Sequence, residues 1–179
     1  GTMRDGEVYA LNDPYRGGTH LPDITVIMPV FAGGDAPAWF VAARGHHADV
    51  GGTTPGSMPP DSRTLADEGV VFDDVAVVAD GAMREAAIRD LLAGGPHPAR
   101  NIDQNIADLA AQVAACARGA AGLRDLAARQ GAAVVTRYMA HVQSHAEAMA
   151  RRMIATLSDG HFRYELDDGA VVEVAVRID

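Results

Sequence analysis

Residues 12–23, NDPYRGGTHLPD, form a polar stretch between two apolar runs. The flanking runs, residues 7–11 and 24–31, have the β-branched and apolar composition that is typical of strands. A tight hairpin needs only about two to five linking residues, and this linker is much longer. It contains two adjacent glycines, two prolines, and His20 and Asp23 at a spacing of three. The pattern predicts paired strands with polar chemistry concentrated at their junction.

A second polar stretch, residues 45–60 with the sequence GHHADVGGTTPGSMPP, follows a third predicted strand over residues 38–43. Sequential strands are neighbours about two-thirds of the time, so both stretches are expected at one edge of the sheet. Imidazole and carboxylate groups gathered in this way suit Zn²⁺, Mn²⁺ or Fe²⁺. The alternative is that these are ordinary turn residues, with glycines supplying positive φ angles and aspartates capping turns. The candidate site residues are His20, Asp23, His46, His47 and Asp49.

The predicted secondary structure changes twice along the chain. Residues 6–80 are rich in predicted strands and loops, residues 82–157 are helical, and residues 161–179 alternate as a C-terminal β-hairpin. We expect residues 1–179 to form a single fragment of one domain.

Apolar residues recur at helical spacing over residues 102–157, with a break at Gly131. This pattern predicts a two-helix hairpin whose apolar faces are buried. The expected fold class is therefore α+β, a mostly antiparallel sheet with a long two-helix hairpin packed against it.

Composition excludes several classes of partner and location. The chain has 179 residues and a formal net charge of −9, with no cluster of Lys or Arg, so nucleic acid and anionic membranes are poor partners. No apolar run approaches the ~18 residues needed to cross a bilayer. The single cysteine, Cys116, rules out a disulfide framework and fits a reducing compartment, so we expect a cytoplasmic protein.

Two long segments resemble the hydantoinase B family: GEVYALNDPYRGGTHLPDITVIMPVF (residues 6–31) and ARGHHADVGGTTPGSMPPDS (residues 43–62). Weaker similarity continues through residues 101–119 and 158–169. The family includes B subunits of ATP-dependent N-methylhydantoinases, the C-terminal half of 5-oxoprolinases, caprolactamase subunits, and subunits of acetone and acetophenone carboxylases. Its members are several times longer, so the resemblance implies an internal fragment.

The resemblance implies a divalent metal, Zn, Mn or Fe, bound by His20, Asp23 and one histidine of the second polar stretch. Positions 46 and 47 are both histidine, so whether the ligand is His46 or His47 stays open. Along a continuing strand the two side chains would point to opposite faces. The resemblance also makes Asp49 a candidate for orienting a ligand imidazole, or for taking a proton as a catalytic residue. Asp13 is a candidate for orienting His20, and an Asx turn ahead of Pro14 is the alternative.

The implied function is hydrolysis of a cyclic amide, such as a hydantoin, 5-oxoproline or a lactam, within a hetero-oligomer. A hydantoinase A-type subunit or domain would bind ATP and Mg²⁺ and activate the amide, since this chain has no Walker-type loop. The metal would generate hydroxide from water or polarise the substrate oxygen, and the sequence does not separate these roles. The alternatives are a subunit of an ATP-dependent ketone carboxylase and a non-catalytic assembly module.

Three other sequence features are not expected to carry chemistry. His141 and His145 are four residues apart on a predicted helix, but the Glu of a His-Glu-x-x-His zinc motif is absent. Cys116 lies in an Ala-rich helix, where cysteine is usually a small buried hydrophobe. Ser57 lacks the Gly-x-Ser-x-Gly spacing of a nucleophile elbow.

Overall fold

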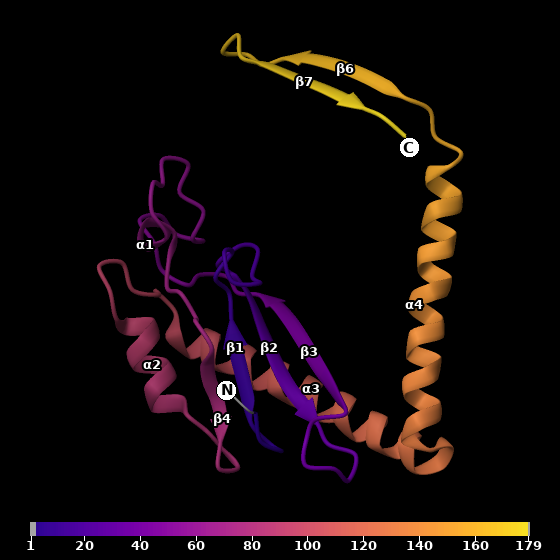
Figure 1. Ribbon diagram of the computed structural model, residues 1–179. Helices are drawn as coiled ribbons and strands as arrows, with labels where there is room; N and C mark the ends of the chain where they lie inside the picture. The colour runs from indigo at the N-terminus through magenta and orange to yellow at the C-terminus, as the bar shows by residue number, and fades with distance from the viewer. Residues whose placement is uncertain (1–2, 179) are drawn as a thin grey trace. The chain divides into compact units, whose positions relative to one another are not determined.

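The computed structural model describes residues 3–178 and confirms an α+β fold (Figure 1). These residues divide into two compact units, of which the first extends to Arg129 and the second begins at Gln130. None of the helices in the described part of the chain is both long and apolar enough to cross a bilayer.

The first unit is built on a five-stranded antiparallel sheet with the strand order β3-β2-β1-β4-β5. The longest pairing joins β2 to the edge strand β3 over eight residues each, which confirms the prediction that sequential strands are neighbours. The strands are β1 (Val8–Leu11), β2 (Asp23–Val30), β3 (Trp39–His46), β4 (Val75–Ala79) and β5 (Ala82–Met83).

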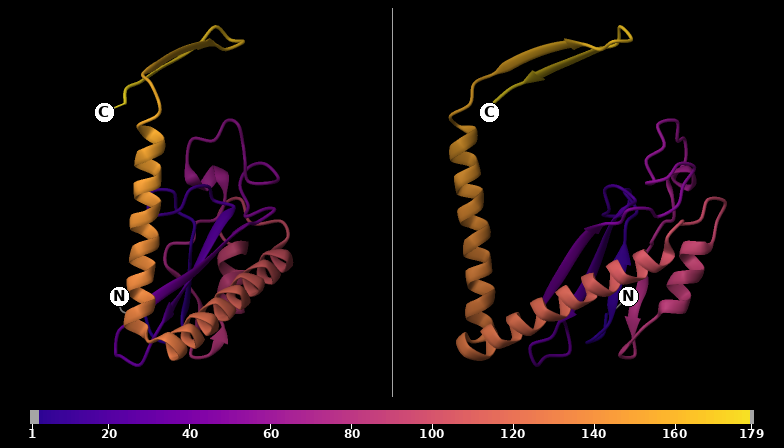
Figure 2. Two further views of the ribbon diagram at one scale, coloured as in Figure 1. Left: turned by 90° about the vertical axis from the view of Figure 1, so that its right-hand side faces the viewer. Right: turned by 180° about the vertical axis from the view of Figure 1, so that it is seen from behind.

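The long helix α3 (Ile102–Gln130) covers one face of this sheet (Figure 2). Its apolar residues are buried in the first part of the helix, including Leu109 and Cys116, as are Ile24 and Val26 of β2. The predicted burial does not extend to the end of the helix, where Leu126 is 38% exposed. We call the face of the sheet that α3 covers the inner face. Cys116 is 2% exposed, which confirms that it is a small buried hydrophobe, and burial raises the pKa of its thiol.

Two shorter helices complete the first unit, α1 (Leu65–Glu68) and α2 (Glu85–Ala93). The opposite face of β3, which we call the outer face, is solvent-exposed at every second residue, from Phe40 to His46. The sheet is therefore covered by a long helix on its inner face and is open at β3 on its outer face.

The second unit contains α4 (Ala132–Ile154) and the two-stranded sheet of β6 (Gly160–Glu165) and β7 (Val171–Val176). The predicted break between the helices occurs at Gly131, which has a φ angle of 85°. The expectation that the apolar face of this second helix is buried is wrong for α4. Tyr138, Val142 and Met153 are each about two-thirds exposed, at 66%, 67% and 65%. A single helix and a two-stranded sheet offer too little apolar surface to cover these side chains within their own unit.

Candidate metal centre

Three of the predicted ligand residues converge at the edge of the sheet where β2 begins and β3 ends. Asp23 is the first residue of β2, His46 is the last residue of β3, and the two are directly paired across the strands. His20 precedes β2 in a tight turn, in which the Asp23 N–H donates to the His20 carbonyl at 2.8 Å. Directly paired residues of antiparallel strands point to the same face, so the pairing register itself brings Asp23 and His46 together.

The three side chains are arranged around a shared point. Asp23 Oδ1 accepts a hydrogen bond from His46 Nδ1 at 2.9 Å, and Asp23 Oδ2 lies 3.7 Å from His20 Nδ1. The two imidazole rings stack with their centroids 5.5 Å apart. One potential ligand atom from each residue lies within 4.8 Å of the other two. We refer to His20, Asp23 and His46 as the His-Asp cluster.

The donor chemistry of the His-Asp cluster fits a divalent metal. Two ring nitrogens and one carboxylate are the ligands that Zn²⁺, Mn²⁺ and Fe²⁺ accept, and three protein ligands leave coordination positions open. The side chains remain accessible, with 30%, 27% and 58% of their surfaces exposed for His20, Asp23 and His46. A small ligand therefore has a route to the cluster from the outer face.

His47 lies on the opposite side of the strand and does not join the cluster. It is completely buried, with Nδ1 lying 2.8 Å from Asn105 Oδ1 and Nε2 lying 3.0 Å from Gln112 Oε1. Its backbone N–H also donates to the carbonyl of Pro22 at 2.8 Å. The structure thus brings His46 and not His47 to the two other predicted ligands.

The amides that hold His47 are themselves fixed by backbone carbonyls. Asn105 Nδ2 donates to the Asp49 carbonyl at 2.9 Å, and Gln112 Nε2 donates to the carbonyls of Ile24 and Ala43 at 2.8 and 3.0 Å. We call His47, Asn105 and Gln112 the His47 clamp. It ties the ends of β2 and β3 to α3, directly behind the cluster.

Sequence reasoning missed Asn105 and Gln112. The available signal was their spacing of seven residues, which places two amides on one face of a helix that is otherwise apolar at its buried positions. Gly45 belongs to the same arrangement, because a Cβ atom there would lie 3.1 Å from Cδ of Gln112. The glycine thus leaves room for the clamp, and β3 continues through it to His46.

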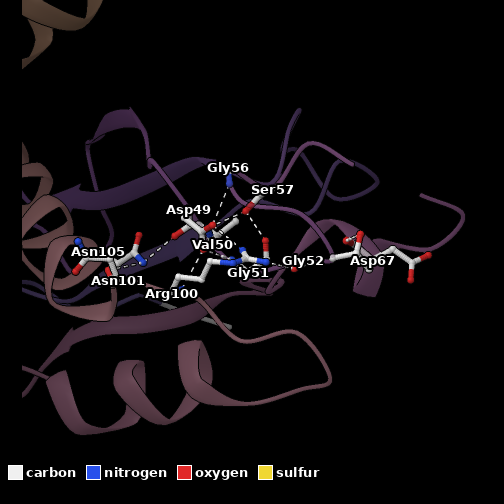
Figure 3. A network of polar contacts seen from close by, with 11 residues as sticks. Asp49, Val50, Gly51, Gly52, Gly56, Ser57, Asp67, Arg100, Asn101 and Asn105 are labelled. Carbon is white, nitrogen blue, oxygen red and sulfur yellow. Dashed lines mark hydrogen bonds and ion pairs between the residues drawn. The ribbon is translucent and has the colours of Figure 1, made fainter. Parts of the chain in front are cut away.

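Asp49 anchors the second polar stretch through its own hydrogen bonds (Figure 3). Its carboxylate accepts hydrogen bonds from the backbone N–H groups of Gly51, Gly56 and Arg100 at 3.0, 3.0 and 3.1 Å. The Arg100 guanidinium adds an ion pair at 2.7 Å. Ser57 completes the loop, because its buried hydroxyl donates to the Gly51 carbonyl at 2.6 Å.

These contacts set the ionisation of Asp49. Burial raises the pKa of this carboxyl, but the three backbone donors and the Arg100 side chain outweigh burial and bring the pKa below its ordinary value. A carboxylate is a weak proton acceptor when its pKa is lowered and both of its oxygens already accept hydrogen bonds. The contacts of Asp49 therefore fit an anchor for the loop.

Asp13 adopts the local turn that was the alternative to orienting His20. Its Oδ1 accepts from the Tyr15 N–H at 2.8 Å, which is the Asx-turn hydrogen bond, and its Oδ2 lies 4.0 Å from Arg16 Nε. The Asp13 carbonyl also accepts from the N–H groups of Arg16 and Gly18. Asp13 thus shapes the loop that carries His20.

The comparisons with known proteins agree with the resemblance seen in the sequence. The sequence profile of the family described as hydantoinase B/oxoprolinase matches residues 1–179. The chain belongs to the hydantoinase B/oxoprolinase family. The 5-oxoprolinase of Dictyostelium discoideum is 40% identical over 185 residues, which cover 98% of this chain and 14% of that protein.

Two further family relatives differ in the activity that their names describe. The acetophenone carboxylase delta subunit of Aromatoleum aromaticum is 32% identical over 161 residues, covering 90% of this chain and 23% of the subunit. The crystal structure of the ATP-dependent caprolactamase from Pseudomonas jessenii superposes with a TM-score of 0.79 and 27% identity, covering 99% of this chain and 31% of that one. This hydantoinase B-type chain therefore spans a minor part of the length of each relative.

Proposed function

We propose that this chain is the metal-bearing part of an ATP-dependent hydrolase that opens a cyclic amide, such as 5-oxoproline, a hydantoin or a lactam. The observation that carries the proposal is the convergence of His20, Asp23 and His46 on the accessible face of the sheet. The names of a 5-oxoprolinase relative and a caprolactamase neighbour support cyclic amides as the substrate class.

Each residue of the cluster has a distinct task in this proposal. His20 and His46 would supply ring nitrogens, and Asp23 would supply a carboxylate to the same divalent ion, Zn²⁺, Mn²⁺ or Fe²⁺. The bound ion would supply Lewis acidity to the amide or to water at neutral pH. The His47 clamp would hold the two strand ends in register, so that the ligands stay preorganised around one point.

The chemistry of the substrate explains a requirement for ATP and a partner. A lactam amide is stabilised by resonance and is attacked slowly by water, whereas an amide phosphorylated on oxygen is activated. We assign binding of ATP and Mg²⁺ to a hydantoinase A-type subunit or domain, because this chain has no Walker-type loop. The open outer face beside the cluster is where the activated amide would enter.

The second candidate function is that of a ketone carboxylase subunit. The similarity to the acetophenone carboxylase delta subunit favours it. The greater similarity to a 5-oxoprolinase, 40% against 32% identity, leads us to prefer the hydrolase. A full complex supplied with ATP would distinguish them, because ring opening requires a cyclic amide and carboxylation requires a ketone with bicarbonate.

The proposal is tested first by metal binding. Purified chain is titrated with Mn²⁺ and Zn²⁺ by calorimetry, alongside the His46→Ala variant and a His145→Ala control on the exposed face of α4. We expect one ion per chain for the wild type and the control, and a loss of affinity of at least about 100-fold for His46→Ala. Equal binding by all three proteins would overturn the proposed metal centre.

Activity of the complex with the A-type partner provides the second test. The His46→Ala complex should lose product formation while ATP hydrolysis by the partner continues. If the His46→Ala complex opens the ring at the wild-type rate, the catalytic assignment is wrong and the chain acts in assembly.

A further inference from the structure

Arg44 is an exposed cation beside the His-Asp cluster. It lies two residues before His46 on β3 and is directly paired with Thr25, just as His46 is paired with Asp23. Residues two apart on a strand share a face and are separated by roughly 7 Å. Arg44 and the cluster therefore stand next to each other on the outer face.

Two threonine hydroxyls orient the Arg44 side chain. Nε donates to Thr25 Oγ1 at 2.8 Å, and an NH1 proton points to Thr19 Oγ1 at 3.4 Å. Thr19 immediately precedes the ligand residue His20. The Arg44 side chain thus reaches from β3 past Thr25 of β2 toward the loop that carries His20, and its NH2 group donates no hydrogen bond within residues 3–178.

No carboxylate neutralises Arg44 within residues 3–178, since none of the ion pairs found there includes it. By contrast, Arg100 and Arg124 of the same unit are paired with Asp49 and Asp5. A planar guanidinium with free donors is suited to bidentate binding of a carboxylate or a phosphoryl group.

We propose that Arg44, oriented by Thr19 and Thr25, binds an anionic oxygen group of the substrate while the cyclic amide lies at the His-Asp cluster. This inference rests on the proposed function and narrows its substrate class. The Cα atoms of Arg44 and His46 are separated by roughly 7 Å, which places Arg44 within reach of a small molecule held at the cluster. The anionic group is either a carboxylate on the ring, as in 5-oxoproline, or a phosphoryl group transferred to the amide.

Charge supports the same assignment. The cluster contains one carboxylate and two imidazoles, so a bound divalent ion would leave it with a net positive charge. Together with Arg44 this makes a local cationic patch on a chain whose formal net charge is −9. Such a patch favours anionic cyclic amides over neutral ones of the same size.

The test compares two ligands that share a ring. Chain loaded with Zn²⁺ is titrated with 5-oxoproline and with 2-pyrrolidone, which lacks the carboxylate, and separately with inorganic phosphate. The variants are Arg44→Gln, Arg44→Lys, and the control Arg118→Gln, which removes an exposed cation from α3 on the other side of the sheet. Metal content is measured on every sample, and Trp39 fluorescence verifies the fold.

We expect the wild type and Arg118→Gln to bind 5-oxoproline roughly tenfold or more tightly than 2-pyrrolidone, as one charge-assisted contact allows. Arg44→Gln should abolish this preference and leave 2-pyrrolidone binding unchanged, with Arg44→Lys between the two. If only phosphate binding depends on Arg44, the anionic group is the phosphoryl group. If Arg44→Gln changes the affinity for neither 5-oxoproline nor phosphate, the inference is overturned. A wild-type chain that takes up no metal would instead refute the proposed function.

Discussion

Replacing Gln112 with alanine should destabilise the first unit far more than the same change elsewhere on α3. Gln112 is 8% exposed and makes three hydrogen bonds, to the carbonyls of Ile24 and Ala43 and to the ring of His47. Each bond contributes about 1 kcal/mol net, and the partners left behind are buried. The expected loss is therefore about 3 kcal/mol in the free energy of unfolding.

The matched control is Gln104→Ala, one exposed position on the same helix. Its side chain donates to Asp108 at 2.7 Å, in an i,i+4 pair that contributes a few tenths of a kcal/mol, and its backbone bond to Asn101 is kept in the variant. Trp39, the single tryptophan, is buried at the start of β3, so its fluorescence reports unfolding of this unit alone. With a urea m-value of about 2 kcal/mol/M, the midpoint should fall by about 1.5 M for Gln112→Ala and hardly change for Gln104→Ala. Equal midpoints for the two variants would refute the His47 clamp.

Two further predictions concern the loop anchored by Asp49. Because the pKa of Asp49 is lowered on folding, its ionised form stabilises the protein fully above the ordinary Asp pKa of about 3.9, and this contribution is lost as the pH falls through the folded-state value. Asp49→Asn should therefore lower the urea midpoint at pH 7, and the difference in midpoint between the variant and the wild type should shrink below about pH 4. A difference in midpoint that does not change with pH would contradict this account. Gly51→Ala should destabilise the protein, because Gly51 has a φ angle of 97° and a Cβ there would collide with the His97 carbonyl. The control Gly56→Ala, with a φ angle of 81° and open space around it, should cost only about 1 kcal/mol in thermal unfolding, and equal losses for the two would argue against the collision.

The sequence was sufficient to predict the elements whose signal is local. Alternation and β-branched residues predicted both ends of β2 and the start of β3 to within one residue, and helical spacing predicted α3. The end of β3 was predicted three residues early, because Gly45 resembles a strand terminator. Neighbouring strands then placed His20 and Asp23 beside the second polar stretch, because one pairing register fixes both strand ends. These inferences need only the periodicity of the chain and the usual adjacency of strands.

Interactions between distant positions were not predictable in the same way. The role of Asp49 depends on Arg100, which lies 51 residues further along and gives no sign in the sequence that it will return to the loop. The apolar face of α4 was predicted to be buried from its amphipathic pattern, but it is largely exposed. An amphipathic pattern identifies an apolar face and does not identify the surface that packs against it. Sequence periodicity thus identifies surfaces more readily than the partners of those surfaces.

The His46–His47 pair shows why one register determines the whole site. Adjacent residues on a strand point to opposite faces, so a slip of one residue would send His47 to the cluster and His46 into the core. The clamp opposes this slip, because both ring nitrogens of His47 are held by amides whose orientation is fixed by four backbone carbonyls. His47 consequently cannot replace its neighbour as a ligand. The loss of metal binding expected for His46→Ala should therefore persist even though an intact histidine remains at the next position.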